Sequence, residues 1–143
     1  MGRILALDYG TKRTGVAVSD PLRIIANALE TVPTARLKEF LKEYIARNSV
    51  DIIVVGKPLQ NSGAPSDSLT HIEPFARWLC KEFPHTEVVM FDERFTSVLA
   101  HRAMIDGGVG RMGRRDKALV DRISATIILQ GYMESLEYSN LKK

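Results

Sequence analysis

The sequence has a single cysteine and no long hydrophobic run. Among its 143 residues only Cys80 carries a thiol, which excludes an internal disulfide. Its neighbours Trp78 and Leu79 predict that this thiol is buried on the apolar face of a helix. No stretch approaches the roughly 18 uninterrupted apolar residues of a membrane span, and the opening residues lack the length and cleavage site of a signal peptide. We therefore expect a cytoplasmic protein.

Aromatic residues and excess charge are also scarce. Aromatics make up 7% of the chain, so base stacking is not expected to dominate any contact with nucleic acid. Twenty basic against seventeen acidic residues give a net charge of +3, which permits a nucleic-acid partner without requiring one. The stretch 94–122 is more basic, with seven basic and three acidic residues. The three histidines show no metal-binding spacing and are predicted to be surface residues: His71, His85 and His101.

Periodicity predicts one α/β domain over residues 1–143, built on a mixed five-stranded sheet. Three strands over 3–8, 14–19 and 24–32 form an antiparallel meander. Two later strands, 51–56 and 87–91, alternate with helices and are therefore reached by helical crossovers. The helices are predicted from the N-cap Thr34 to Asn48, through Phe75, Leu79 and Phe83, over 98–105, and from about 116 to 136. The segments 60–68 and 107–115 are predicted to be loops.

Three carboxylates stand at conspicuous places in this pattern. Asp8 ends an apolar strand, and Glu93 follows the end of another. Asp121 shares a helix face with Ala125, Ile128 and Tyr132, so it points toward apolar surroundings. Carboxylates suit Mg²⁺ or Mn²⁺, and two such ions can activate water and stabilise the leaving oxygen of a phosphodiester. The pattern indicates a site in which Asp8, Glu93 and Asp121 are catalytic acids that bind two ions.

Each acid also has an ordinary structural explanation. Asp8 could cap the turn at Gly10 and Thr11. Glu93 could pair with Arg94 or Arg13 at the surface, and Asp121 could pair with Lys117 one helical turn earlier. Local pattern alone leaves both interpretations open.

Four motifs, in order over essentially the whole chain, resemble those of the YqgF family of pre-16S rRNA nucleases, also called Holliday-junction-resolvase-like proteins. The first runs from Leu7 through Asp8-Tyr9-Gly10-Thr11 to Asp20. The others are Gly56-Lys57-Pro58-Leu59, Asp92-Glu93-Arg94-Phe95-Thr96 and the helix from Lys117 to Gln130. The chain departs from these motifs at two positions. Lys57 stands where many family members have an apolar residue, and Phe95 stands where leucine is more usual.

The resemblance implies a ribonuclease-H-like fold, dependence on divalent metal, a bacterial cytoplasmic setting and processing of the 5′ end of the 16S rRNA precursor. By position it also implies that Asp8, Glu93 and Asp121 are the metal-binding acids. The partner would be structured RNA or branched DNA, and the protein a monomer or weak homodimer.

Basic residues near these acids are candidates for holding substrate phosphates, with a solvated surface as the alternative. Those beside the predicted site are Lys12, Arg13, Lys57, Arg94 and Lys117. Arg111, Arg114 and Arg115 lie among glycines, an arrangement that would let them adapt to phosphate spacing.

Three other functions fit parts of the pattern. The domain could bind nucleic acid or a ribosome-assembly partner without turnover, or it could cut four-way DNA junctions. The turn Asp8-Tyr9-Gly10-Thr11 also resembles the phosphate-binding hairpin of sugar and acetate kinases, but those enzymes close two such domains around a nucleotide, and 143 residues supply one.

Overall fold

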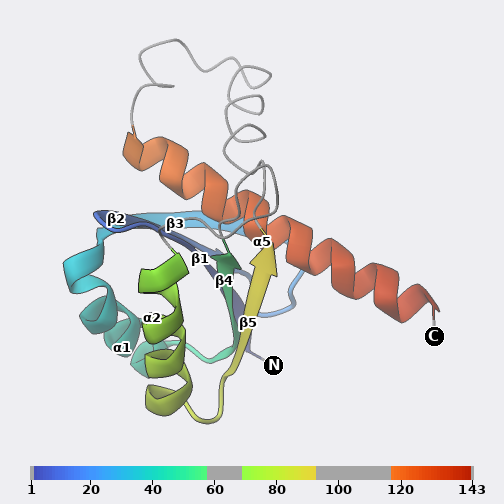
Figure 1. Ribbon diagram of the computed structural model, residues 1–143. Coiled ribbons are helices and arrows are strands. Elements are labelled where there is room, and N and C mark those ends of the chain that lie inside the picture. The colour runs from blue at the N-terminus through green and yellow to red at the C-terminus, as the bar shows by residue number, and fades with distance from the viewer. Residues whose placement is uncertain (1, 58–68, 93–116, 143) are drawn as a thin grey trace.

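A five-stranded mixed sheet forms the centre of the molecule, with helices on both faces (Figure 1). The structure, a computed structural model, describes residues 2–57, 69–92 and 117–142. The strand order is β3-β2-β1-β4-β5. The strands are β1 (Arg3–Tyr9), β2 (Arg13–Ser19), β3 (Ala26–Pro33), β4 (Val50–Lys57) and β5 (Glu87–Asp92).

The pairing confirms the predicted topology. β1 pairs antiparallel with β2, which pairs antiparallel with β3, so the first three strands are a meander. β1 also pairs in parallel with β4, and β4 in parallel with β5. Because parallel neighbours point the same way, the ends of β1, β4 and β5 meet at one edge of the sheet.

The helices divide between the two faces of the sheet (Figure 1). They are the 3₁₀ turn η1 (Thr34–Arg36), α1 (Leu37–Arg47), α2 (Leu69–Glu82) and α5 (Lys117–Lys142). Leu5, Leu7 and Val16 face α1 and α2, where Leu41 and Leu79 complete a buried cluster. The alternate strand residues Ile4, Ala6, Ala17 and Val54 form a second cluster with Ala125, Ile128 and Leu129 of α5. Alternation along the strands therefore decides which helix each side chain meets.

The turn before β3 differs from the prediction, because the strand begins at Ala26 and not at Ile24. The Asp20 carboxylate accepts hydrogen bonds from the backbone N–H groups of Leu22, Ile24 and Ile25 at 3.2, 2.7 and 2.8 Å. Arg23 adopts a positive φ of 59° in the same turn. These bonds hold the backbone in a turn that leaves Leu22 and Ile24 each 69% exposed.

Two side chains also depart from their predicted roles. Thr34 does not cap the helix: its hydroxyl donates to the Gly10 carbonyl at 2.6 Å, and α1 begins only at Leu37. Cys80 is exposed, because the buried stripe of α2 runs through Ile72, Phe75 and Leu79 and a turn of about 100° per residue carries Cys80 off it.

The last helix is longer than predicted, since α5 reaches Lys142. The predicted helix over 98–105 and loops over 60–68 and 107–115 lie outside the described residues. Of the helices in the described ranges, none combines the length and apolar content needed to cross a membrane. Among the predicted surface histidines, His85 is exposed, and the side chains of His71 and His101 lie outside the described part.

Candidate active site

Asp8 lies near the end of the central strand and is partly buried. Ile4 and Ala6, two and four residues earlier, pack in the cluster under α5. Because side chains alternate along a strand, Asp8 belongs to the same face. Its partner across the antiparallel ladder is Gly15 of β2.

The glycine at position 15 lets α5 lie directly on the sheet. A Cβ atom there would collide with the backbone carbonyl oxygen of Asp121. Glycine in a strand interior often marks such a close approach of another backbone. Asp121 is therefore held over the strand residue that pairs with Asp8, and the structure brings these two predicted acids to one end of one face.

Arg13 joins the hairpin to the helix at this point. Its Nε atom donates to Oδ2 of Asp121 at 2.8 Å, across 108 residues of sequence. The side chains are 39% and 20% exposed, so water screens the pair and its net contribution to stability is small. The expected alternative partner of Asp121 was Lys117, whose side chain lies outside the described part. The partner in the structure comes from another element.

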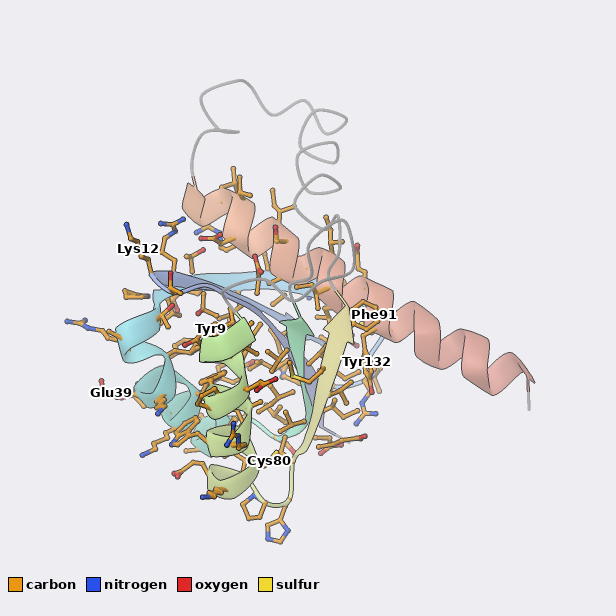
Figure 2. All side chains as sticks on the ribbon, in the orientation of Figure 1. Tyr9, Lys12, Glu39, Cys80, Phe91 and Tyr132 are labelled. Carbon is orange, nitrogen blue, oxygen red and sulfur yellow. The ribbon has the colours of Figure 1, made fainter. Side chains whose placement is uncertain are left out.

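The turn that carries Lys12 and Arg13 is braced from the opposite side. The hydroxyl groups of Thr14 and Thr34 lie 3.0 Å apart, and Thr34 also donates to Gly10. The Thr34 N–H donates to the Lys12 carbonyl at 3.0 Å. The backbone of the turn is thus fixed, while the Lys12 side chain is exposed near the start of α5 (Figure 2).

The other predicted site residues are only partly visible. The described part of β5 ends at Asp92, which pairs with Lys57 at the end of β4. Glu93 is the next residue and lies outside the described residues, as do Arg94, Arg111, Arg114 and Arg115. Lys57 and Lys117 lie at the end of β4 and the start of α5, and their side chains are not in the described part.

The oxygen donors present fit a hard divalent cation. Carboxylates are the preferred ligands of Mg²⁺ and Mn²⁺, and Asp8 and Asp121 supply them from two neighbouring elements. Within the described ranges, no three acidic, histidine or cysteine side chains form a ligand group. A third acid would have to come from elsewhere in the chain.

A cavity opens on the other face of the same strand end. Tyr9 follows Asp8 and points the opposite way, toward α2 (Figure 2). With Thr34, Ala35, Lys38, Pro74 and Phe75 it lines a cavity of about 380 Å³. Burial raises the pKa of the Tyr9 phenol above its ordinary value. Sequence reasoning missed this cavity, because its walls come from three segments with no shared motif. It also missed the role of Gly15, although a glycine inside a strand is a signal for close approach.

Comparison with known proteins gives whole-length matches. Residues 2–135 match the family described as "RuvX: Holliday junction resolvase". A protein of Phocaeicola vulgatus named "Putative pre-16S rRNA nuclease" is 55% identical over 96% of this chain and 99% of its own length. One of the same name from Bacteroides thetaiotaomicron is 54% identical over 96% of this chain and its entire length, 100%. The solved structure of YeaZ from Pseudomonas aeruginosa superposes with a TM-score of 0.45 at 20% identity, over 76% of this chain and 50% of that one.

Proposed function

The chain belongs to the RuvX family of Holliday junction resolvases, and from this premise we propose that it is the member that trims the 5′ end of the 16S rRNA precursor. Membership makes the protein a nuclease, a hydrolase of ester bonds in nucleic acid, on the ribonuclease-H-like sheet that the resemblance implied. The name shared by its relatives supports RNA as the substrate. The work would take place in the cytoplasm, on structured RNA.

One observation carries the assignment of the site. The backbone of α5 at Asp121 is seated on Gly15, the residue that pairs with Asp8 across the ladder. Two partly buried acids from distant parts of the chain therefore lie on neighbouring elements at one end of the sheet. Carboxylates placed close together repel each other unless a cation lies between them, so a metal site would account for two acids at this end of the sheet.

In the proposed mechanism, Asp8, Asp121 and Glu93 would hold two divalent cations, Mg²⁺ or Mn²⁺. Bound there, these ions would supply Lewis-acid activation of water and stabilisation of the leaving oxygen. Asp8 takes the central position because it lies on the middle strand of the sheet. The hydrogen bond that Arg13 donates to Oδ2 of Asp121 would orient this carboxylate for a ligand.

The basic residues would hold the substrate backbone. Lys12 and Arg13 lie on the braced turn beside the acids, where their charges can meet phosphate oxygens. Lys57, Arg94 and Lys117 flank the same strand and helix ends in the sequence. Arg111, Arg114 and Arg115 would follow the backbone further away.

The test is cleavage of RNA that carries the 5′ precursor end, by purified protein with Mn²⁺ or Mg²⁺. Asp8→Asn and Asp121→Asn should each lower the cleavage rate about 100-fold or more, the scale expected when one group that stabilises the transition state is lost. Asp51→Asn is the matched control, because Asp51 is an exposed strand acid near the start of β4, at the opposite end of the sheet. Cleavage that survives in Asp8→Asn would show that another nuclease in the preparation is responsible.

A second substrate has support from the family description itself, which names Holliday junctions. Four-way junction DNA should therefore be cut in parallel with the precursor RNA, at equal concentrations. Faster cutting of the junction would reverse the substrate proposed here while leaving the acids in their roles.

A further inference from the structure

The cavity beside Tyr9 has the size and lining of a ligand site. Its volume of about 380 Å³ lies within the ~300–1,000 Å³ of typical small-molecule sites. The floor is aromatic: Phe75 is 5% exposed, and its ring lies 4.9 Å from that of Tyr9, with an angle of 34° between the planes. Tyr9 itself is only partly buried and lines the cavity.

The rim of the cavity is polar and positively charged. Lys38 lines it and is exposed, with its Nζ atom 5.0 Å from the centre of the Trp78 ring. Among the described residues that line it, none is acidic. By contrast, a smaller cavity of about 190 Å³ on the same side of the sheet is lined by Glu43 as well as Tyr44 and Arg47. The Tyr9 cavity therefore favours an anionic ligand with a flat, stackable part.

The cavity lies next to the candidate active site. Tyr9 and Asp8 are consecutive, so their Cα atoms are about 3.8 Å apart while their side chains point to opposite faces. A nucleic-acid strand that crosses this sheet edge with one phosphate at Asp8 would place a neighbouring nucleotide at Tyr9. The substrate would then cross the end of the sheet from one face to the other.

We propose that this cavity binds the base of one unpaired nucleotide next to the scissile phosphate, with the base stacked on Tyr9 and the adjoining phosphate at Lys38. The inference rests on the proposed nuclease function and adds to it the requirement for an unpaired flank. The low aromatic content predicts that base stacking does not dominate contact with nucleic acid. A single stacked base is compatible with that prediction, because it needs only one exposed ring. Ribose and deoxyribose strands share this chemistry, so both belong in the test.

The experiment measures binding in a protein that does not cut. Asp8→Asn is titrated with single-stranded RNA and with DNA of the same sequence, each carrying one 2-aminopurine at successive positions. Stacking on an aromatic ring quenches this fluorescent base, so one position should be quenched strongly. An abasic site at that position should weaken binding about fivefold or more, the scale of losing one stacked base.

Paired variants in the same background locate the effect. Tyr9→Leu and Lys38→Ala should each remove the quenching and weaken binding about fivefold or more. Tyr44→Leu and Lys42→Ala are their matched controls: Tyr44 lines the smaller cavity, and Lys42 lies 5.9 Å from the same Trp78 ring but does not line the Tyr9 cavity. Both controls should bind like the parent. Lys38 is exposed, so Lys38→Ala keeps the test valid if Tyr9→Leu unfolds.

Three results would overturn the inference: no binding by the parent protein, equal affinity for intact and abasic strands at every position, or equal losses in Lys38→Ala and Lys42→Ala. Failure of the nuclease function has a different signature. In that case the wild-type protein fails to cut any substrate, whether or not binding depends on the base. Preference for RNA over DNA in the same titration would show that the ribose 2′-hydroxyl is also recognised.

Discussion

At the scale of single residues, Arg13 is the link between the β1–β2 hairpin and α5. Its guanidinium places a positive charge beside Asp121, where a divalent cation is proposed to bind. Arg13→Gln should therefore bind Mn²⁺ about fivefold tighter, because one repelling charge near the protein surface contributes on the order of 1 kcal/mol. Isothermal titration calorimetry measures this directly, without any need for cleavage.

Arg13→Lys is the control for that variant, since it keeps the charge and should bind Mn²⁺ nearly as the wild type does. Both substitutions should change the free energy of unfolding by no more than about 1 kcal/mol, because the pair is partly exposed. Equal Mn²⁺ affinity in Arg13→Gln and wild type would mean that Asp121 is not a metal ligand.

The stabilisation that Asp20 gives to the turn before β3 depends on pH. The backbone N–H groups of Ile25, Ile24 and Leu22 donate to its carboxylate and hold its pKa below the ordinary value. Because the folded pKa lies below the unfolded pKa of about 3.9, the stabilisation is complete above that value and is lost as the pH falls through the folded pKa.

Asp20→Ala should accordingly be less stable than wild type near neutral pH, and the gap should close in acid. Urea unfolding of both proteins at a series of pH values measures the gap. A gap that stays constant at all pH values would mean that the side chain acts by packing and not by its charge.

At the scale of secondary-structure elements, the contact between α5 and β2 depends on the absence of a side chain at Gly15. In Gly15→Ala the new methyl group meets the Asp121 carbonyl, which is backbone and cannot turn aside. We expect the free energy of unfolding to fall by about 1–3 kcal/mol, the usual cost of overpacking, and cleavage to fall with the displacement of Asp121. Chemical denaturation and the cleavage assay report the two effects.

Gly131→Ala is the matched control within α5. There a new Cβ would lie 3.2 Å from atoms at the edge of the Phe91 ring, a side chain that can shift. Alanine also favours helix over glycine by about 1 kcal/mol, which offsets the closer contact. This variant should stay within about 1 kcal/mol of wild type, and a loss as large as that of Gly15→Ala would argue against a specific role for position 15.

Elements with strong local periodicity were predictable, and those set by distant partners were not. The buried apolar run of β1 and the stripe of Ala125, Ile128 and Tyr132 in α5 follow from nearest neighbours, and both are as predicted. The start of β3 was misjudged because Asp20 binds the backbone that follows it. Thr34 was misjudged because Gly10, 24 residues earlier, takes its hydroxyl.

In the candidate site, too, features set by nearest neighbours were predictable and features set by distant partners were not. The position of Asp8 at a strand end and the inward direction of the Asp121 face could be inferred from sequence. The pairing of Asp121 with Arg13 could not, because no local pattern links residues 108 positions apart. The shared placement of Glu93 with these acids remains a prediction.

At the scale of the whole molecule, the single thiol lies far from the candidate site. Cys80 is near the C-terminal end of α2, and Figure 2 shows it toward the lower end of this helix, away from Tyr9 and Lys12. Labelling the protein with a fluorescent maleimide should therefore be complete under native conditions and leave the cleavage rate unchanged within about twofold, because exposed thiols react readily. Inactivation in proportion to labelling would place the substrate path across this end as well.

The distance along the chain between Arg13 and Asp121 has a consequence during synthesis. At about 5–20 residues per second, a ribosome takes about 5–20 s to add the 108 residues that separate them. Until α5 has emerged, the hairpin holds Asp8 without the helix that carries Asp121, the second acid of the candidate site. A nascent chain therefore spends this interval with Asp8 and Asp121 apart, and the proposed active site can assemble only after α5 has been made.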